Sequence, residues 1–170
     1  MKLLLLALLL PALQEPIVVA VPDADAVAFV FGKEFRVMKV APGSTLKISA
    51  GGPKDISILI TLIPDKESKF QTEDDVRKAT VQALQSMVTH SVEKRMDLKS
   101  FDNRDVRGFY SSFTDESLVG KPVTDGKYLK VTSGLFSLGK TAATFTILYN
   151  DSGEAFHKSA LLSMTRVRLN

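Results

Sequence analysis

Residues 56–63 have the sequence ISILITLI, and Pro64 follows directly. The alternation at period two predicts a β-strand, because successive side chains of a strand point to opposite faces of a sheet. One face carries three isoleucines and a leucine, and the other carries Leu59 and Ile63 beside a serine and a threonine. We therefore expect a strand that ends at Pro64, is central in its sheet and is largely buried on both faces.

Further strand segments lie on both sides of this run. They are short stretches rich in β-branched and aromatic residues, and glycines and turn signals separate them. Their ranges are residues 27–31, 35–40, 45–50, 96–101, 106–113, 128–133 and 141–149.

Two helices are expected among these strands. Thr72 can cap a helix that runs to about Lys94, and the acids at residues 73–75 suit the positive end of its dipole. A second helix begins with the capping-box pattern of residues 151–154. Its apolar stripe consists of Phe156, Ala160, Met164 and Val167. This order of elements predicts one α+β domain, in which an antiparallel β-sheet is covered by two main helices.

With this order of elements, the chain resembles the PsbP-like fold family. The family is named for an extrinsic subunit of photosystem II and is shared with Mog-type Ran-binding proteins and an exported bacterial branch. The resemblance covers roughly residues 27–170 as a single domain and rests on the element order, the helix from Thr72, the strand segment Gly108-Phe109-Tyr110, residues 144–148 and the closing helix. It implies an α/β sandwich and a non-catalytic binding or assembly role. The resemblance identifies no functional residue in this chain, and it implies no role in photosynthesis.

The first 20 residues have the layout of a secretory signal peptide. Lys2 precedes an apolar run from Leu3 to Leu13, and cleavage patterns occur at Val18-Val19-Ala20 and at Ala24-Asp25-Ala26. We expect cleavage after residue 20, or as late as residue 26, and an exported product that is periplasmic or secreted. An uncleaved N-terminal anchor is the alternative. The apolar run is too short to span a bilayer.

Composition excludes several classes of site. The 170 residues include no cysteine, so there is no thiolate nucleophile, zinc–thiolate or iron–sulfur site, disulfide or lipid-modified cysteine.

The formal net charge is +3. Loss of residues 1–20 removes one Lys and one Glu and leaves +3, whereas loss of residues 1–26 removes two further Asp and gives +5. The basic residues form no tract, so we expect no nucleic-acid partner.

Residues 134–141 match the phosphate-binding P-loop pattern G-x-x-x-x-G-K-[ST]. In a P-loop, Lys140 would reach the terminal phosphates and the Thr141 hydroxyl would hold magnesium. The motif also needs a helix after Thr141, because the helix N-terminus binds the phosphates. A strand pattern follows instead. We therefore expect a β-hairpin that turns near Gly139.

Other candidate site residues have simpler explanations. His90 and His157 lie one on each expected helix, without a partner at a catalytic or metal-ligand spacing. The helix dipole explains Glu73–Asp75, and a tight turn explains the acids and asparagine of Asp102–Asp105, which lack the rest of a calcium loop. We therefore assign no catalytic, cofactor or metal residue.

Two surface features complete the candidates. Asn150-Asp151-Ser152 matches a glycosylation acceptor, but the expected helix cap explains the same residues. The loop Ser117–Gly126 carries glycine, proline and mixed charge between two strands, where binding surfaces often lie. A plain strand connection is the alternative for this loop.

The expected function is that of an exported, non-enzymatic domain that binds a protein partner or another component of the cell envelope. Two alternatives stay open. A small-ligand carrier would have a large pocket between helix and sheet. A nucleotide-binding or hydrolytic enzyme would use Gly134–Thr141.

Overall fold

The structure consists of two antiparallel sheets and two main helices. It is a computed structural model that describes residues 15–41, 45–50, 56–101, 103 and 105–170, with residues 37–41 and 45–50 described by their backbone alone. The large sheet has the strand order β3 (Phe35–Ala41), β4 (Thr45–Ala50), β5 (Ile56–Pro64), β9 (Thr141–Tyr149), β8 (Lys130–Leu138), β7 (Arg107–Thr114) and β6 (Lys99–Ser100). The small sheet holds β2 (Val27–Phe29) between β1 (Ile17–Val19) and β10 (Arg168–Leu169). The predicted α+β class is confirmed.

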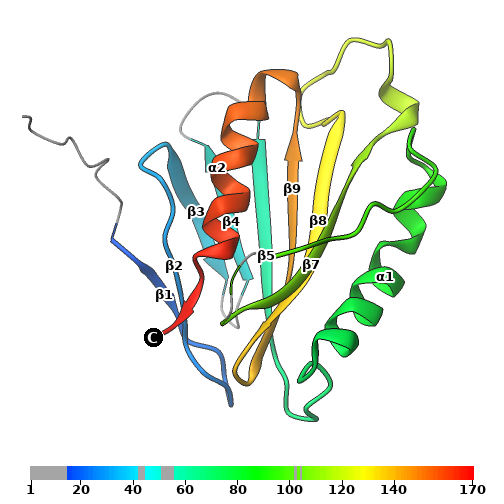
Figure 1. The fold of residues 1–170 in the computed structure, drawn as a ribbon. Coiled ribbons are helices and arrows are strands. Elements are labelled where there is room, and N and C mark those ends of the chain that lie inside the picture. Colours follow the sequence, from blue (N-terminus) through cyan, green and yellow to red (C-terminus); the bar gives the residue numbers. More distant parts are fainter. Residues whose placement is uncertain (1–14, 42–44, 51–55, 102, 104) are drawn as a thin grey trace, which may run out of the picture.

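The two helices cover different parts of the large sheet. Helix α2 (Glu154–Thr165) lies in front of the sheet in Figure 1, and α1 (Glu73–Thr89) lies at the β7 end. None of the helices in the described part of the chain is long and apolar enough to cross a membrane.

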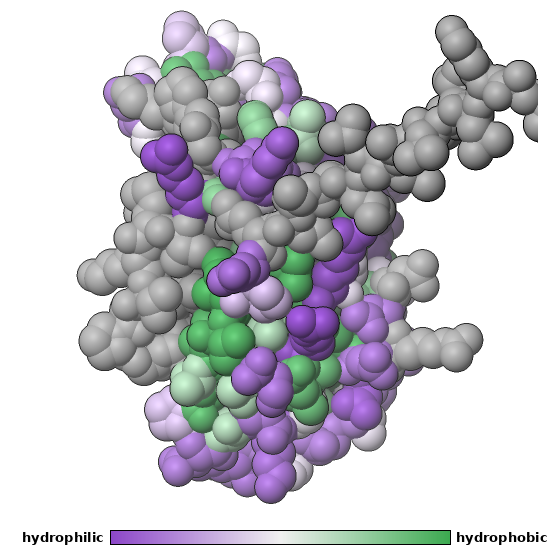
Figure 2. All heavy atoms as spheres, turned by 90° about the vertical axis from the view of Figure 1, so that its left-hand side faces the viewer, coloured by the Kyte–Doolittle hydropathy of each residue, from purple (hydrophilic) through white to green (hydrophobic). Residues whose placement is uncertain are grey.

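The short edge strands β1 and β10 were not expected from the sequence pattern. Val18 of β1 and Leu169 of β10 are exposed. Figure 2 views the side on which β1 lies in Figure 1, and it shows hydrophobic residues gathered in the middle of that face. Residues 17–19 belong to the expected signal peptide, whose residues 1–14 lie outside the described part. Its cleavage stays a prediction.

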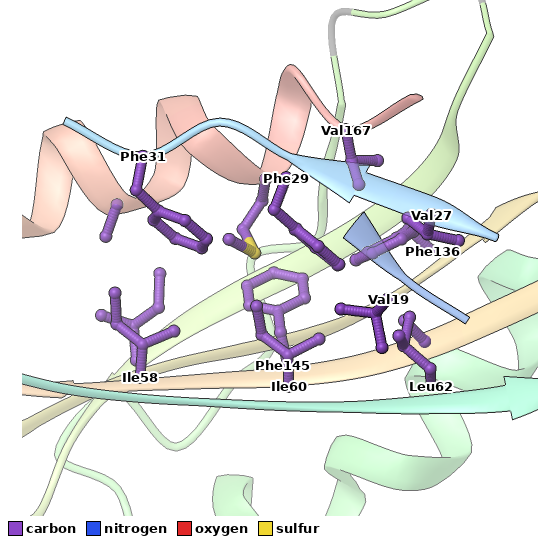
Figure 3. Packing of buried hydrophobic residues seen from close by; sticks show 14 of the residues in the cluster. Val19, Val27, Phe29, Phe31, Ile58, Ile60, Leu62, Phe136, Phe145 and Val167 are labelled. Atoms are coloured by element: carbon purple, nitrogen blue, oxygen red, sulfur yellow. The ribbon is translucent and has the colours of Figure 1, made fainter. Parts of the chain in front are cut away.

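One face of the large sheet is buried beneath the small sheet and α2. Ile60 of β5 and Phe145 of β9 meet Phe29 of β2 and Phe136 of β8 in this layer (Figure 3). The rings of Phe29 and Phe136 lie edge to face, with 6.4 Å between their centroids. Burial of each large apolar side chain stabilises the fold by about 1.5–3 kcal/mol. This layer is the main hydrophobic core.

Helix α1 packs on the β7 and β8 half of the opposite face. Val76 of α1, Phe109 and Leu135 form a second, smaller core there. On the same face of β5, Leu59 and Ile63 are 44% and 37% exposed. The expectation that this strand is central is confirmed, since β4 and β9 flank it. The expectation that both its faces are buried is wrong, because α1 lies over the other half of the sheet.

The start of α1 follows the sequence prediction. The Thr72 hydroxyl accepts the Asp75 N–H at 3.1 Å, and the Asp75 carboxylate accepts the Thr72 N–H at 3.2 Å. This reciprocal pair is a capping box, which satisfies two amide groups that the first helical turn leaves free.

The end of α1 comes earlier than expected, at Thr89 instead of near Lys94. The Ser91 hydroxyl donates to the Val88 carbonyl at 3.1 Å, and Ser91 forms an isolated β-bridge with Asp115. These local bonds replace the next helical turn.

Other expectations also differ from the structure. The strand expected over 27–31 ends at Phe29, and Val167, expected on the second helix, lies beyond the end of α2 at Thr165. Of residues 96–101, only the two residues of β6 form a strand, whereas the strand expected over 128–133 extends to Leu138. The capping box expected over 151–154 is not formed, since residues 151–153 make a 3-10 turn and α2 has no side-chain cap. Instead, the Asp151 carboxylate pairs with Lys130 at 2.8 Å.

Asp65 organises the connection from β5 to α1. Its buried carboxylate accepts the Lys69 N–H at 2.7 Å, the Phe70 N–H at 3.1 Å and the Gln71 side-chain amide at 2.8 Å. Burial alone would raise the pKa of Asp65, but these hydrogen bonds hold the pKa below its usual 3.8. The Asp65 N–H also donates to the Lys140 carbonyl at 2.8 Å. Asp65 therefore ties the start of α1 to the β8–β9 turn.

Asp65→Asn is expected to lower the free energy of unfolding at neutral pH by about 1–3 kcal/mol, because an amide cannot accept all three hydrogen bonds. The folded-state pKa lies below the unfolded-state value, so the carboxylate contributes stability that is present above about pH 4 and is lost as the pH falls further. The free energy of unfolding of the variant should therefore fall less than that of the original protein as the pH drops below about 4. Urea unfolding at neutral and acidic pH measures both effects. An equal loss in the control Asp97→Asn, whose exposed carboxylate lies 3.6 Å from Lys99, would contradict this role.

Candidate functional site

The P-loop-like segment forms a β-hairpin, as predicted. Strand β8 ends at Leu138, β9 begins at Thr141, and Gly139 in the two-residue turn has a φ of 58°. Glycine adopts this left-handed conformation without strain. Gly134 lies within β8, where an added Cβ would come within 2.3 Å of the Phe109 carbonyl oxygen. Of the two glycines in the pattern, Gly139 allows the turn and Gly134 allows the strands to pack closely.

Asp25 lies directly against this turn. Its carboxylate accepts the Lys140 N–H at 2.9 Å, and its carbonyl oxygen accepts the Thr141 hydroxyl at 2.9 Å. A Cβ on Gly139 would meet the same carboxylate at 2.5 Å. The amide of the P-loop-like lysine therefore binds a carboxylate of the protein itself.

A groove of about 710 Å³ opens beside the hairpin turn. It lies at the lower end of the molecule in Figure 1, at the turn between β8 and β9 and beside β10. Three basic side chains line it, namely Arg107 at the start of β7, Lys140 in the turn and Arg168 in β10. The other lining residues are Asp25, Gln71, Asp105, Leu138, Gly139 and Leu169.

Positive charge is in excess in this groove. Within the described residues, none of its three basic side chains forms an ion pair, whereas lysines elsewhere do, such as Lys78 with Asp74 at 2.6 Å. Asp25 and Asp105 offset part of the charge, but Asp25 is already hydrogen-bonded to the turn. The exposed guanidinium and ammonium groups are therefore available to anionic groups of a ligand.

The sequence alone does not bring these three basic residues together. They belong to segments that are far apart in the chain and form no basic tract. Pairing of β7 with β8 and of β10 with β2 places them at one end of the fold. The sequence carries no common signal for the three residues, because β10, which holds Arg168, was not expected from the sequence pattern.

His90 lines a second hollow, of about 240 Å³, between the end of α1 and strands β7 and β8. Its apolar lining comes from Met87, Phe113 and Val131. The small-ligand alternative expected a large pocket between helix and sheet. This hollow has that location but is smaller than typical ligand sites of about 300–1,000 Å³.

His157 is buried in α2 against β8 and β9. Its ring stacks on Tyr149 with 4.2 Å between centroids, and its Nε2 lies 2.9 Å from the Thr132 hydroxyl, which in turn lies 2.7 Å from the Ser112 hydroxyl. Its Nδ1 has no hydrogen-bond partner among the described residues. Burial lowers the pKa of His157 below its usual 6.5, so the neutral ring is favoured. Because the ring is buried, stacked on Tyr149 and engaged at Nε2 by the Thr132 hydroxyl, the arrangement suits packing better than general-base chemistry.

The acidic candidates have local structural roles. Asp74 pairs with Lys78, and Asp75 completes the capping box of α1. Asp102 lies outside the described residues, and the Asn103 side chain accepts the Asp105 N–H at 2.9 Å, as in a tight turn. In the part of the chain that the structure describes, no three His, Asp or Glu side chains could hold a metal ion together.

The last two candidates lie near the opposite end of the large sheet from the groove. The Asn150 side chain accepts the Leu129 N–H at 2.8 Å, so the residue of the glycosylation pattern joins two chain segments. The loop Ser117–Gly126 exposes Val119 and Val123 and contributes no residue to the groove (Figure 1).

Comparison with known proteins identifies the fold. No family model matches the chain, and no curated protein matches it by sequence. The solution structure of cyanobacterial PsbP (CyanoP) from Synechocystis sp. PCC 6803 matches with a TM-score of 0.55 and 11% identity, over 96% of this chain and 96% of that chain. A crystal structure from Bacteroides thetaiotaomicron VPI-5482 matches 85% of this chain with a TM-score of 0.48 and 12% identity, and this chain spans about 45% of its length. The likeness to CyanoP shows a PsbP-like fold.

His157→Gln is expected to lower the free energy of unfolding at neutral pH by about 1 kcal/mol, through loss of the Tyr149 stack. Because the folded-state pKa is lowered, the neutral imidazole contributes stability above about pH 6.5 that is lost as the pH falls below that value. The variant should have a weaker decline in stability in this range. Chemical unfolding across mildly acidic pH measures the slope. His90→Gln, which changes an exposed histidine outside α2, is the control, and an equal change in slope there would contradict the assignment to His157.

Proposed function

We propose that this chain, which has a PsbP-like fold, is an exported, non-catalytic binding module that holds an acidic segment of a partner protein in the cell envelope. The groove beside the hairpin turn is its binding site. The signal-peptide pattern of the first 20 residues supports export.

The observation that carries the proposal is the set of three basic side chains in one groove, none of which forms an ion pair with another described residue. Arg107 and Arg168 each offer a planar fork of N–H donors that fits a carboxylate with two parallel hydrogen bonds. Lys140 adds a third positive charge from the turn. Leu138 and Leu169 provide apolar surface beside these charges. Such a lining suits an acidic peptide that also carries an apolar side chain.

The composition of the groove supports binding over catalysis. Among the described residues, its lining holds no histidine, serine, threonine or tyrosine, and of its two carboxylates Asp25 is already hydrogen-bonded to the turn. Hydrolysis would need a nucleophile or a positioned base beside the substrate. The nearby Thr141 hydroxyl is buried and donates to the Asp25 carbonyl.

The hollow beneath the end of α1 supports a second candidate function, the transport of a small apolar molecule. Its volume of about 240 Å³ suits a small apolar ligand of about ten heavy atoms, since a cavity of about 150 Å³ already holds benzene. Binding of such a molecule would leave the basic groove unchanged, so the two functions are separable.

Titration with a hexaglutamate peptide tests the basic groove. The double variant Arg107→Gln with Arg168→Gln is expected to bind the peptide about tenfold more weakly, since two exposed ion pairs of up to about 1 kcal/mol each are lost. Binding should also weaken as salt is raised. Calorimetry at low and physiological salt measures both effects.

The matched control is Arg77→Gln with Arg95→Gln, which removes two exposed charges outside the groove. An equal loss of affinity in this control would mean that net charge alone attracts the peptide. Magnesium-dependent ATP hydrolysis that disappears in Lys140→Ala would overturn the non-catalytic proposal and favour the P-loop alternative.

A further inference from the structure

Strand β1 coincides with the expected end of the signal peptide. Ile17–Val19 pairs antiparallel with β2, with Val18 opposite Ala28 and Val19 opposite Val27. The same residues precede the expected cleavage position after Ala20. Cleavage there would remove the whole of β1 from the folded domain.

The side chains of β1 fill a defined place in the core. Val19 is only 5% exposed, Ile17 packs against the same core, and Val18 points outward at 49% exposure. Figure 3 shows Val19 between Val27 of β2 and Leu62 of β5. The β1 position therefore accepts an extended segment in which two apolar residues flank one outward-facing residue.

Removal of β1 would leave one edge of β2 without a partner. All three residues of β2 are buried, and β10 occupies the other edge. Unpaired N–H and C=O groups at a buried strand are unfavourable, and an added strand from another chain would satisfy them. The apolar space left by Ile17 and Val19 would receive alternate side chains of that strand.

The chain after the cleavage point stays anchored. Val21 is buried in the main core, and the Ala24 N–H donates to its carbonyl at 3.2 Å. A new N-terminus at Val21 would therefore lie at the end of the open position without filling it. Figure 2 also shows hydrophobic residues on the side of the molecule where β1 lies, which suits a partner surface around this edge.

We propose that cleavage after Ala20 converts the β1 position into an acceptor for an extended segment of a partner protein. That segment adds antiparallel to β2 and places apolar side chains where Ile17 and Val19 lie. This site is separate from the basic groove, and the proposal rests on the predicted export of the chain.

The first measurement is the mass and N-terminal sequence of the protein exported by its native pathway. We expect an N-terminus at Val21. An N-terminus at or before Ile17 would keep β1 in the domain and overturn the proposal. Any N-terminus after Val21 would overturn it as well, because the anchored start of the acceptor would be lost.

The second measurement uses the exported protein and a synthetic peptide with the sequence of residues 15–20, EPIVVA. The peptide should bind, and the backbone amides of β2 should become more protected from hydrogen exchange. A peptide with Val19→Asp should bind at least about tenfold more weakly, because a carboxylate would have to be buried. The matched peptide with Val18→Asp should bind nearly as well as the original, since that side chain faces solvent.

Other outcomes decide against the proposal. A monomer whose β2 amides are already protected and that does not bind the peptide would overturn it. A stable dimer that the peptide does not dissociate would assign the position to a second copy of this chain. An unfolded exported protein supports the proposal if the peptide restores its structure and overturns it otherwise. The double variant Arg107→Gln with Arg168→Gln should still bind EPIVVA. This result separates a failure of the acceptor proposal from a failure of the basic-groove proposal.

Discussion

The layer of side chains between β5 and β2 is the contact on which the rest of the structure depends. Phe29 of β2 and Phe136 of β8 meet within it, above Ile60 of β5. A three-residue strand has little stability of its own, so this layer fixes the position of β2. The position of β2 then fixes β10, which carries Arg168. The groove at the end of the fold is thus a consequence of core packing.

The sequence best predicted those elements whose own residues show a clear hydrophobic pattern or a local capping group. Residues 45–50 and 141–149 alternate at period two and form strands with those bounds. Thr72 caps α1 because its hydroxyl acts within one turn. The exposure of Leu59 could not be predicted, since alternation does not tell which half of a sheet a helix will cover. The strands β1 and β10 are too short to show a period.

The candidate site was less predictable than the fold. The strand pattern after Thr141 was sufficient to predict a hairpin in place of a phosphate-binding loop, because that motif depends on its immediate context. The contact between Asp25 and the Lys140 amide joins distant segments and has no local signal. The same holds for Arg107 and Arg168, which only strand pairing brings to one groove. The burial of His157 depends likewise on how α2 lies on β8 and β9.

The position of β2 between β1 and β10 also bears on the order of folding events. Ala28 lies opposite Val18 on one side and Arg168 on the other, so the small sheet joins the two ends of the chain. Such distant pairing is slow, because a long loop must close before its contacts form. The small sheet can be completed only after Arg168 has been added to the growing chain, because β10 pairs with β2. The layer between β2 and the large sheet therefore closes late, although β2 itself lies near the start of the fold.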